Sequence, residues 1–203
     1  MTKFVDSKFF NDHSEGDHGK ETILTYWLSW SLRLAGDNND YCKDKPILKR
    51  HCMFMLFKLL GIEHYNGIRV LEVKVKKEWH RIDLIAEIMI ERDGCKERHV
   101  LMMENKAYTY MTENQRDNYP TIVIRYYGTP QEKKYILHQV LLTCFEWSNP
   151  NDAPKIKYLE EFCANCPQWR VMSIEDVTTE SNQYTESELF NTFWLGNWNC
   201  LTE

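Results

Sequence analysis

The pattern of hydrophobic and polar positions divides the chain into helical and strand-like segments. Between residues 21 and 35 the apolar residues recur every three or four positions, which predicts an amphipathic helix. A second apolar stretch opens at Pro46 and closes at Gly61, and it is apolar on most sides, which predicts a buried helix. The later patterns predict strands at 68–79, 135–145 and 169–174 and a short helix at 156–166.

The middle of the chain predicts a β-hairpin. Residues 81–91 and 98–106 read as two apolar strands, and Asp93-Gly94 between them favours a two-residue turn. With that turn, Arg92 faces Cys95 and the residue numbers of every facing pair add to 187. Asp83 then faces Glu104, with the two β carbons about 5 Å apart on the same side of the sheet.

The hairpin is expected to lie in the middle of a sheet. Lys106 shares the face of Asp83 and Glu104, as do Ile85 and Met102. The opposite face is filled by apolar residues, namely Leu84, Ala86, Ile88, Leu101 and Met103. Both faces are therefore covered, and two acids and an amine gather at one end.

Such a cluster suits a metal-assisted reaction. Two carboxylates this close repel each other by more than about 1 kcal/mol once water is scarce, and a divalent cation would relieve the repulsion. Mg²⁺ takes one or two carboxylates and keeps sites for water and phosphate oxygens. Lys106 would then orient or deprotonate the attacking water, or stabilise charge on the phosphate. The alternative is a solvated cluster at a strand end, because Glu-x-Lys also occurs at Glu72 and Glu132.

The same residues resemble a known family. Ile82-Asp83-Leu84, Met103-Glu104-Asn105-Lys106, Gln115 and Tyr119 are similar to the IDL…IENK…Q…Y pattern of bacterial members of the PD-(D/E)XK nuclease superfamily. The likeness covers roughly residues 20–180. It implies a restriction-endonuclease-like α/β fold, a mixed β-sheet flanked by α-helices.

The resemblance also implies an activity and a set of ligands. The activity would be Mg²⁺-dependent phosphodiester hydrolysis by an endonuclease or exonuclease, most often on DNA. Mg²⁺ or Mn²⁺ would be held by Asp83, Glu104 and the backbone carbonyl of Asn105. A Glu on the first helix often reaches the metal in this superfamily, which makes Glu21 a further metal-ligating and catalytic candidate beside the catalytic Lys106.

Gln115 is the remaining catalytic candidate. Thr112 is a plausible N-cap, which puts Gln115 in the first turn of a helix just beyond the acids, where its amide would hold a water or a phosphate oxygen. Pro120 departs from the uninterrupted helix of the family pattern. In the tail, Thr185 is expected to open a helix with Glu188 in capping-box register. Its aromatic side chains are expected to seal the core or a homodimer face, and they are Phe190, Phe193, Trp194 and Trp198.

Length, composition and charge limit the number of domains, the partners and the cellular location that the sequence predicts. A chain of 203 residues without a Pro, Gly or Ser-rich linker predicts one domain over 1–203, with an irregular segment at 1–18 and a helical tail at 181–203. The net charge of −5 requires any nucleic-acid contact to be local. Seven cysteines and no evident signal peptide suggest free thiols in the cytoplasm, and no apolar run is as long as a membrane span.

Two other functions stay open. The acidic charge and Pro120 favour a nuclease-fold relative that no longer cuts and serves as a binding or assembly module. Hydrolysis of a small phosphoester would use the same ions without a basic groove. P-loop, dinucleotide-binding, HExxH and GxSxG signatures are absent from the sequence.

Overall fold

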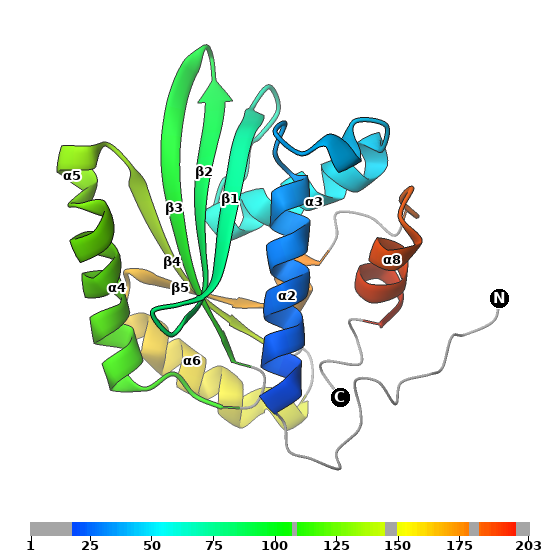
Figure 1. The fold of residues 1–203 in the computed structure, drawn as a ribbon. Helices are drawn as coiled ribbons and strands as arrows, with labels where there is room; N and C mark the ends of the chain where they lie inside the picture. Colours follow the sequence, from blue (N-terminus) through cyan, green and yellow to red (C-terminus); the bar gives the residue numbers. More distant parts are fainter. Residues whose placement is uncertain (1–17, 107–108, 145–149, 179–182, 198–203) are drawn as a thin grey trace.

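A five-stranded mixed sheet forms the centre of the protein, with the strands in the order β1-β2-β3-β4-β5 (Figure 1). The computed structural model describes residues 18–106, 109–144, 150–178 and 183–197. β1, β2 and β3 pair antiparallel, whereas β3, β4 and β5 pair parallel. The strands are β1 (Arg69–Trp79), β2 (Ile82–Arg92), β3 (Cys95–Lys106), β4 (Ile136–Thr143) and β5 (Trp169–Ser173).

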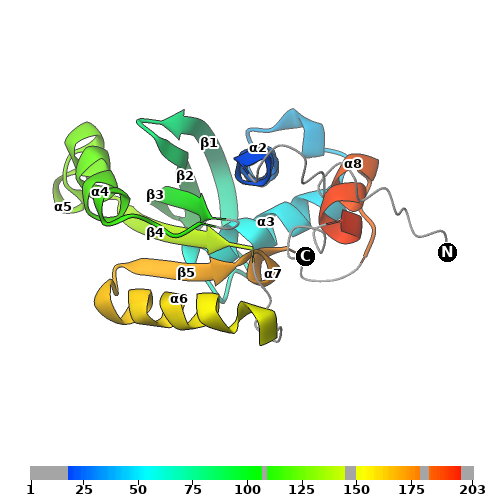
Figure 2. The same cartoon turned by 90° about the horizontal axis from the view of Figure 1, so that it is seen from below.

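Helices cover both faces of this sheet (Figure 2). One apolar core lies between the sheet and α2 (His18–Leu34), α3 (Pro46–Leu60), α7 (Ile174–Val177) and α8 (Glu188–Phe190). A second core lies between the sheet and α4 (Glu113–Tyr127) and α6 (Ala153–Asn165). The short α5 is Pro130–Lys133, and turns of other helical types are Asp40–Cys42, Pro150–Asp152 and Asn191–Asn197. The predicted α/β fold, a mixed sheet flanked by helices, is confirmed.

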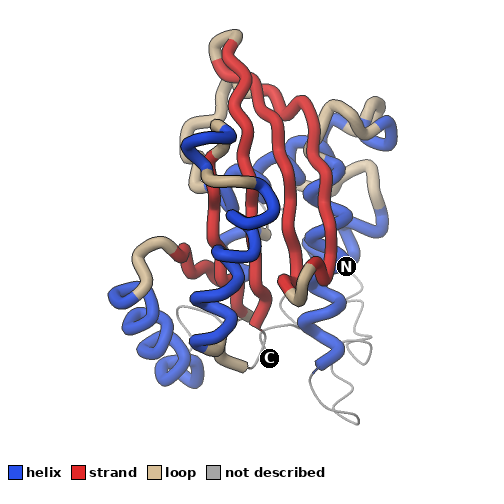
Figure 3. The backbone as a smooth tube through the Cα atoms, turned by 60° about the vertical axis from the view of Figure 1, so that its left-hand side comes forward, coloured by secondary structure: helices blue, strands red, loops and turns tan. Residues whose placement is uncertain are grey.

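The β2–β3 hairpin has the predicted turn and register. Asp93 and Gly94 have φ values of 52° and 75°, as a type I′ turn requires at both central positions. The ladder pairs Arg92 with Cys95 and continues without a shift to the pair of Leu84 and Met103. Figure 3 shows the turn at one end of the sheet, so the other ends of β2 and β3 carry the acids.

The two faces of the hairpin are buried as the alternation predicted. Leu84, Ala86 and Met103 belong to the core beneath α2 and α3. Ile85 and Met102 belong to the core beneath α4 and α6. Since Glu104 and Lys106 follow Met102 at intervals of two, they lie on the α4 side of the sheet.

The start of the tail helix differs from the prediction. Ser187, not Thr185, is the N-cap of α8, because its hydroxyl accepts from the Phe190 N–H at 3.3 Å. Glu188 is thus the first helical residue and has no capping-box role. The Thr185 hydroxyl instead accepts from the Ser187 N–H and donates to Asn191. Phe190, Phe193 and Trp194 are buried, so they do seal the core. Trp198 and residues 1–17 lie outside the described residues.

Two bulk expectations can be checked in the described ranges. The six cysteines there are free thiols, in keeping with the prediction. None of the helices described is long and apolar enough to cross a membrane.

Two neighbouring strands carry a histidine pair, in which His99 of β3 is buried and His138 of β4 is partly buried. His99 Nδ1 and His138 Nε2 are 2.9 Å apart, so one ring donates and the other accepts. Burial, and then the neighbouring His99 and Arg170, lower the pKa of His138 to about 4. Burial likewise lowers the pKa of His99, although Glu97 offsets part of that effect. The pair is therefore neutral at neutral pH.

This pair predicts acid sensitivity. A histidine whose pKa is depressed by folding contributes stability that is present above its ordinary pKa of about 6.5 and lost as the pH falls toward about 4. We expect His138→Gln, which cannot be protonated in this range, to lose less free energy of unfolding between pH 7.5 and pH 5 than the wild type. Urea unfolding at both pH values measures this. The exposed His64→Gln is the control, and equal losses in all three proteins would contradict the prediction.

Candidate active site

The predicted residues meet where β3 and β4 end. Because these strands are parallel, Lys106 and Thr143, their last residues, are paired at the same end of the sheet. In Figure 1 this end is at the bottom, where α2, α4 and α6 also begin. The partial positive charge of a helix N-terminus favours anions, so the three starts favour negative groups at this place.

Asp83 and Glu104 are held in place by different groups. The backbone N–H of Asn105 donates to Asp83 Oδ2 at 2.8 Å. Glu104 Oε1 accepts from Lys106 Nζ at 2.8 Å and from Gln115 Nε2 at 2.7 Å. Glu104 Oε2 is buried and has no hydrogen-bond partner among the described residues. Glu104 is only 1% exposed, whereas Asp83 is partly exposed, so solvent reaches the pair from the side of Asp83.

Burial and like charge make the two acids hard to ionise together. Burial, and then the charge of Asp83, raise the pKa of Glu104 to about 7. Burial also raises the pKa of Asp83, although the Asn105 N–H and Lys106 offset part of this. Burial alone would lower the pKa of Lys106, but the attraction of Glu104 and the nearby acids outweighs it and the pKa is raised. Lys106 is therefore a charged ammonium.

Gln115 links the first turn of α4 to Glu104. Its backbone N–H donates to the hydroxyl of Thr112, and its Oε1 accepts from the Thr112 N–H at 3.0 Å, which completes a capping box. Its Nε2 also contacts the Tyr119 hydroxyl at 3.3 Å, and that hydroxyl donates to the carbonyl of Arg81. Pro120 lies inside α4 without ending it, so Gln115 and Tyr119 both face the acids.

Glu21 lies at the margin of this group. It is in the first turn of α2, and its Oε1 accepts from the Thr109 hydroxyl at 3.2 Å. Its charge is close enough to raise the pKa of both Asp83 and Lys106. Within the described ranges, however, no three Asp, Glu, His or Cys side chains form a cluster that could hold a metal. Glu21 therefore does not complete a three-ligand set with the two central acids.

The oxygen atoms at the centre of the site still suit a small, hard metal cation. Mg²⁺ is commonly bound through one or two carboxylates, with water and phosphate filling its other positions. Oε2 of Glu104 is a buried acceptor to which no group in the described part of the chain donates a hydrogen bond. The Asn105 N–H points to Asp83, and in a strand the carbonyl of the same residue leaves on the same side. Asp83, Glu104 and that carbonyl thus offer oxygen ligands of the kind that Mg²⁺ or Mn²⁺ takes.

Two residues at this end were missed from the sequence. Thr143 is 1% exposed, and its hydroxyl has no hydrogen-bond partner in the described part of the chain, although it is paired with Lys106 across the strands. Lys155, near the start of α6, donates to the carbonyl of Cys144 at 2.8 Å, and burial lowers its pKa. No local pattern of the sequence could have found either residue, because only the parallel pairing of β4 with β3 brings them to this end of the sheet, where functional groups gather at the carboxyl ends of parallel strands.

The raised pKa of Glu104 predicts that a neutral side chain at this position stabilises the folded protein. A carboxyl group whose pKa is raised by folding costs stability as the pH rises from its ordinary value toward about 7. With divalent ions removed by EDTA, we expect Glu104→Gln to be more stable than the wild type by about 1–3 kcal/mol at pH 8, and by much less at pH 5. Urea unfolding at both pH values checks this, and a variant less stable than wild type at pH 8 would contradict it.

Comparison with known proteins is consistent with this geometry. The model of one family, described as the PD-(D/E)XK nuclease superfamily, matches residues 11–189. No curated protein and no solved structure matches the chain. The match covers most of the 203 residues and includes every element that carries the site. The chain therefore belongs to the PD-(D/E)XK nuclease superfamily.

Proposed function

We propose that the protein is a metal-dependent nuclease that hydrolyses phosphodiester bonds, with DNA as its polymer. The observation that carries the proposal is the state of Glu104, a buried carboxylate with one oxygen held by Lys106 and Gln115 and the other without a partner among the described residues. A buried polar atom left unpaired costs about 1–3 kcal/mol, which folding alone does not explain. A cation between Glu104 and Asp83 would supply the missing partner and relieve the repulsion.

Asp83, Glu104 and the Asn105 carbonyl would hold Mg²⁺ or Mn²⁺, and Glu21 would support them from the first turn of α2. When bound, such an ion supplies Lewis-acid activation of the scissile phosphate. Gln115 keeps Glu104 Oε1 occupied through its amide, so that Oε2 is the oxygen left for a ligand. Superfamily membership supports a nuclease, and the resemblance of Asp83, Glu104 and Lys106 to the superfamily pattern supports these roles.

Lys106 acts as a charged donor in this proposal. Its pKa is raised and its ammonium is 2.8 Å from Glu104, so it is a poor base in the arrangement described. A fixed positive charge beside the acids suits the negative charge that builds on the phosphate oxygens during hydrolysis. Of the roles considered for Lys106, electrostatic stabilisation or water orientation is favoured over proton abstraction.

Contacts to the polymer would come from groups around the acids, because the whole protein carries a net charge of −5. Lys106 and Lys155 lie at the ends of β3 and β4, and the exposed Arg81 lies two residues before Asp83. The starts of α2, α4 and α6 add the positive ends of their dipoles. These positive groups lie close to the acids, so they can contact a phosphate backbone without a basic surface elsewhere on the protein.

Cleavage assays test the proposal. Purified protein with Mg²⁺ or Mn²⁺ is expected to cut plasmid DNA, single-stranded DNA or both, and EDTA is expected to stop it. Glu104→Gln and Lys106→Met should each lower kcat by at least about 100-fold, since the first removes a carboxylate that would hold the cation and the second removes the positive charge beside the reacting phosphate. An RNA of the same sequence as the DNA substrate shows which polymer is preferred.

The chain offers matched controls at Glu132 and Lys134, another Glu-x-Lys. They lie beside the start of β4, about seven residues of strand or roughly 23 Å from the paired ends of β3 and β4. Glu132→Gln and Lys134→Met should keep wild-type cleavage. Cleavage that survives Glu104→Gln or Lys106→Met would remove those residues from the mechanism. An intact fold that neither binds Mn²⁺ nor cuts any polymer would support the non-cutting binding module instead.

A further inference from the structure

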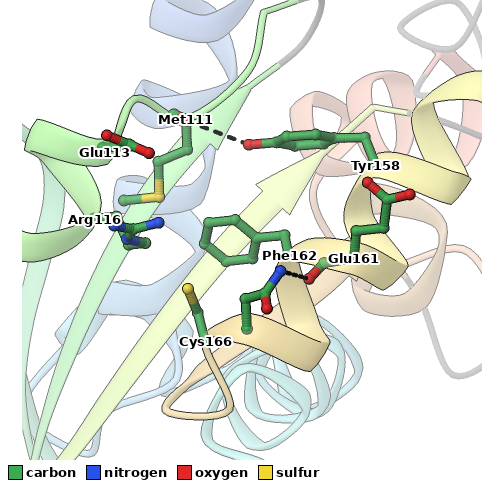
Figure 4. Close-up of a pocket in the computed structure, with 8 residues that line it drawn as sticks. Met111, Glu113, Arg116, Tyr158, Glu161, Phe162 and Cys166 are labelled. Atoms are coloured by element: carbon green, nitrogen blue, oxygen red, sulfur yellow. Dashed lines mark hydrogen bonds between the residues drawn. The ribbon is translucent and has the colours of Figure 1, made fainter.

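A pocket lies between α4 and α6, next to the acids but outside the proposed metal site (Figure 4). It encloses about 240 Å³. Its floor is apolar and buried, with Met111, Phe162 and Cys166 each less than one-tenth exposed. Tyr158 forms one side, and the rim is polar, with Glu113, Arg116, Glu161 and Asn165.

Two consecutive residues connect this pocket to the active site. The Tyr158 hydroxyl donates to the carbonyl of Met111 at 3.2 Å. The next residue, Thr112, donates its N–H to Gln115, whose amide contacts Glu104. The first turn of α4 therefore presents Gln115 to the acids and Glu113 and Arg116 to the pocket. A polymer bound at the acids would pass directly beside the pocket.

The charge of the rim argues against a phosphate in the pocket. Among the described residues of the rim, Glu113 and Glu161 bring two carboxylates, and the guanidinium of Arg116 is already paired with Asp117 through two hydrogen bonds of 2.7 and 2.8 Å. A phosphate would meet a net negative rim. An uncharged group that carries N–H donors would instead find carboxylate and amide oxygens as acceptors.

The aromatic side chains favour a flat ring as that uncharged group. Tyr158 and Phe162 lie side by side with centroids 6.2 Å apart. Tyr110 packs on Tyr158 at 4.3 Å and is 51% exposed, which extends the aromatic surface into the connection between β3 and α4. The volume is below the roughly 300 Å³ at which sites for drug-sized ligands begin, so one ring system fits better than a whole nucleotide.

We propose that this pocket holds one unpaired nucleobase of the polymer that the acids cut. Aromatic side chains stack on unpaired bases, and carboxylate and amide groups bind their edges. The inference rests on the proposed nuclease function and adds a substrate class to it, namely strands with unpaired bases near the scissile phosphate. Base-paired strands would leave the pocket empty, so the pocket would add nothing to the affinity for a duplex.

Kinetics of the full-length protein with Mg²⁺ test the pocket, with single-stranded DNA and a duplex of the same sequence as substrates. Tyr158→Ala should raise KM for the single strand about 5- to 150-fold, the range expected for one lost base stack, with little change in kcat or in duplex cleavage. Tyr158→Phe keeps the ring and loses only the hydrogen bond to Met111, so it should behave like wild type. Tyr184→Ala is the matched control, because this tyrosine is 66% exposed in the segment that packs on the start of α3.

A second variant guards against misfolding of Tyr158→Ala. Asn165 is exposed on the rim, so Asn165→Trp should narrow the mouth without disturbing the core, and it should raise KM for the single strand in the same way. Equal effects on single strand and duplex, or a fall in kcat with KM unchanged, would overturn the inference, as would Asn165→Trp and Tyr158→Ala both matching Tyr184→Ala. If wild-type protein cuts neither substrate, the proposed function itself fails, which is a separate outcome.

Discussion

The spacing between the two acids is set by a turn far from them. Asp93 and Gly94 adopt the left-handed conformation at both central positions, and this turn determines which residue of β2 faces which residue of β3. Asp83 is ten residues along the strand from Asp93, or roughly 30 Å. A slip of one residue would turn Asp83 to the opposite face of the sheet, against the core of α2 and α3. Because both faces of the hairpin are buried, such a slip would also expose or misplace its apolar residues, and the register is strongly specified.

The active site brings together acidic groups whose burial and repulsion lower the stability of the folded protein. Glu104 is buried beside Asp83, whose charge makes Glu104 harder to ionise, and burial raises the pKa of Asp83 as well. The backbone N–H of Asn105, the Lys106 ammonium and the Gln115 amide offset part of this cost. Sites that bind ions or charged substrates commonly reduce stability in this way, since the groups are arranged for a ligand rather than for the free protein. The pairing of β2 with β3 and the capping box at the start of α4 hold these groups beside one another.

Much of the fold and the centre of the site could be predicted from the sequence. The hairpin register followed from two turn residues and from alternation, because side chains in a strand repeat with period two. The position of Gln115 followed from Thr112 as an N-cap. Thr143 and Lys155 were not predicted, because no local pattern shows that β4 lies parallel to β3 with its end beside Lys106. The pocket between α4 and α6 was missed for the same reason, since Met111, Tyr158 and Cys166 come together only through tertiary packing.

The tail shows where local signals mislead. Thr185 and Glu188 have the spacing of a capping box, but Ser187 and Thr185 compete for the same role within two residues. In the structure Phe190 and Trp194 pack into the core of α2 and α3, and the short helix begins two residues later than predicted. Propensity is a weak guide wherever aromatic burial determines the position of so short an element.

Position 115 illustrates how two demands restrict evolution at one site. The helix start requires a side chain that accepts from Thr112, which glutamate and glutamine both satisfy. Glu104 requires a donor, which glutamate cannot provide and which lysine could provide only by giving up the cap. An amide of this length meets both needs. Natural variants of this chain that retain both contacts should therefore tolerate almost no drift at this codon, even though the residue is neither buried nor charged.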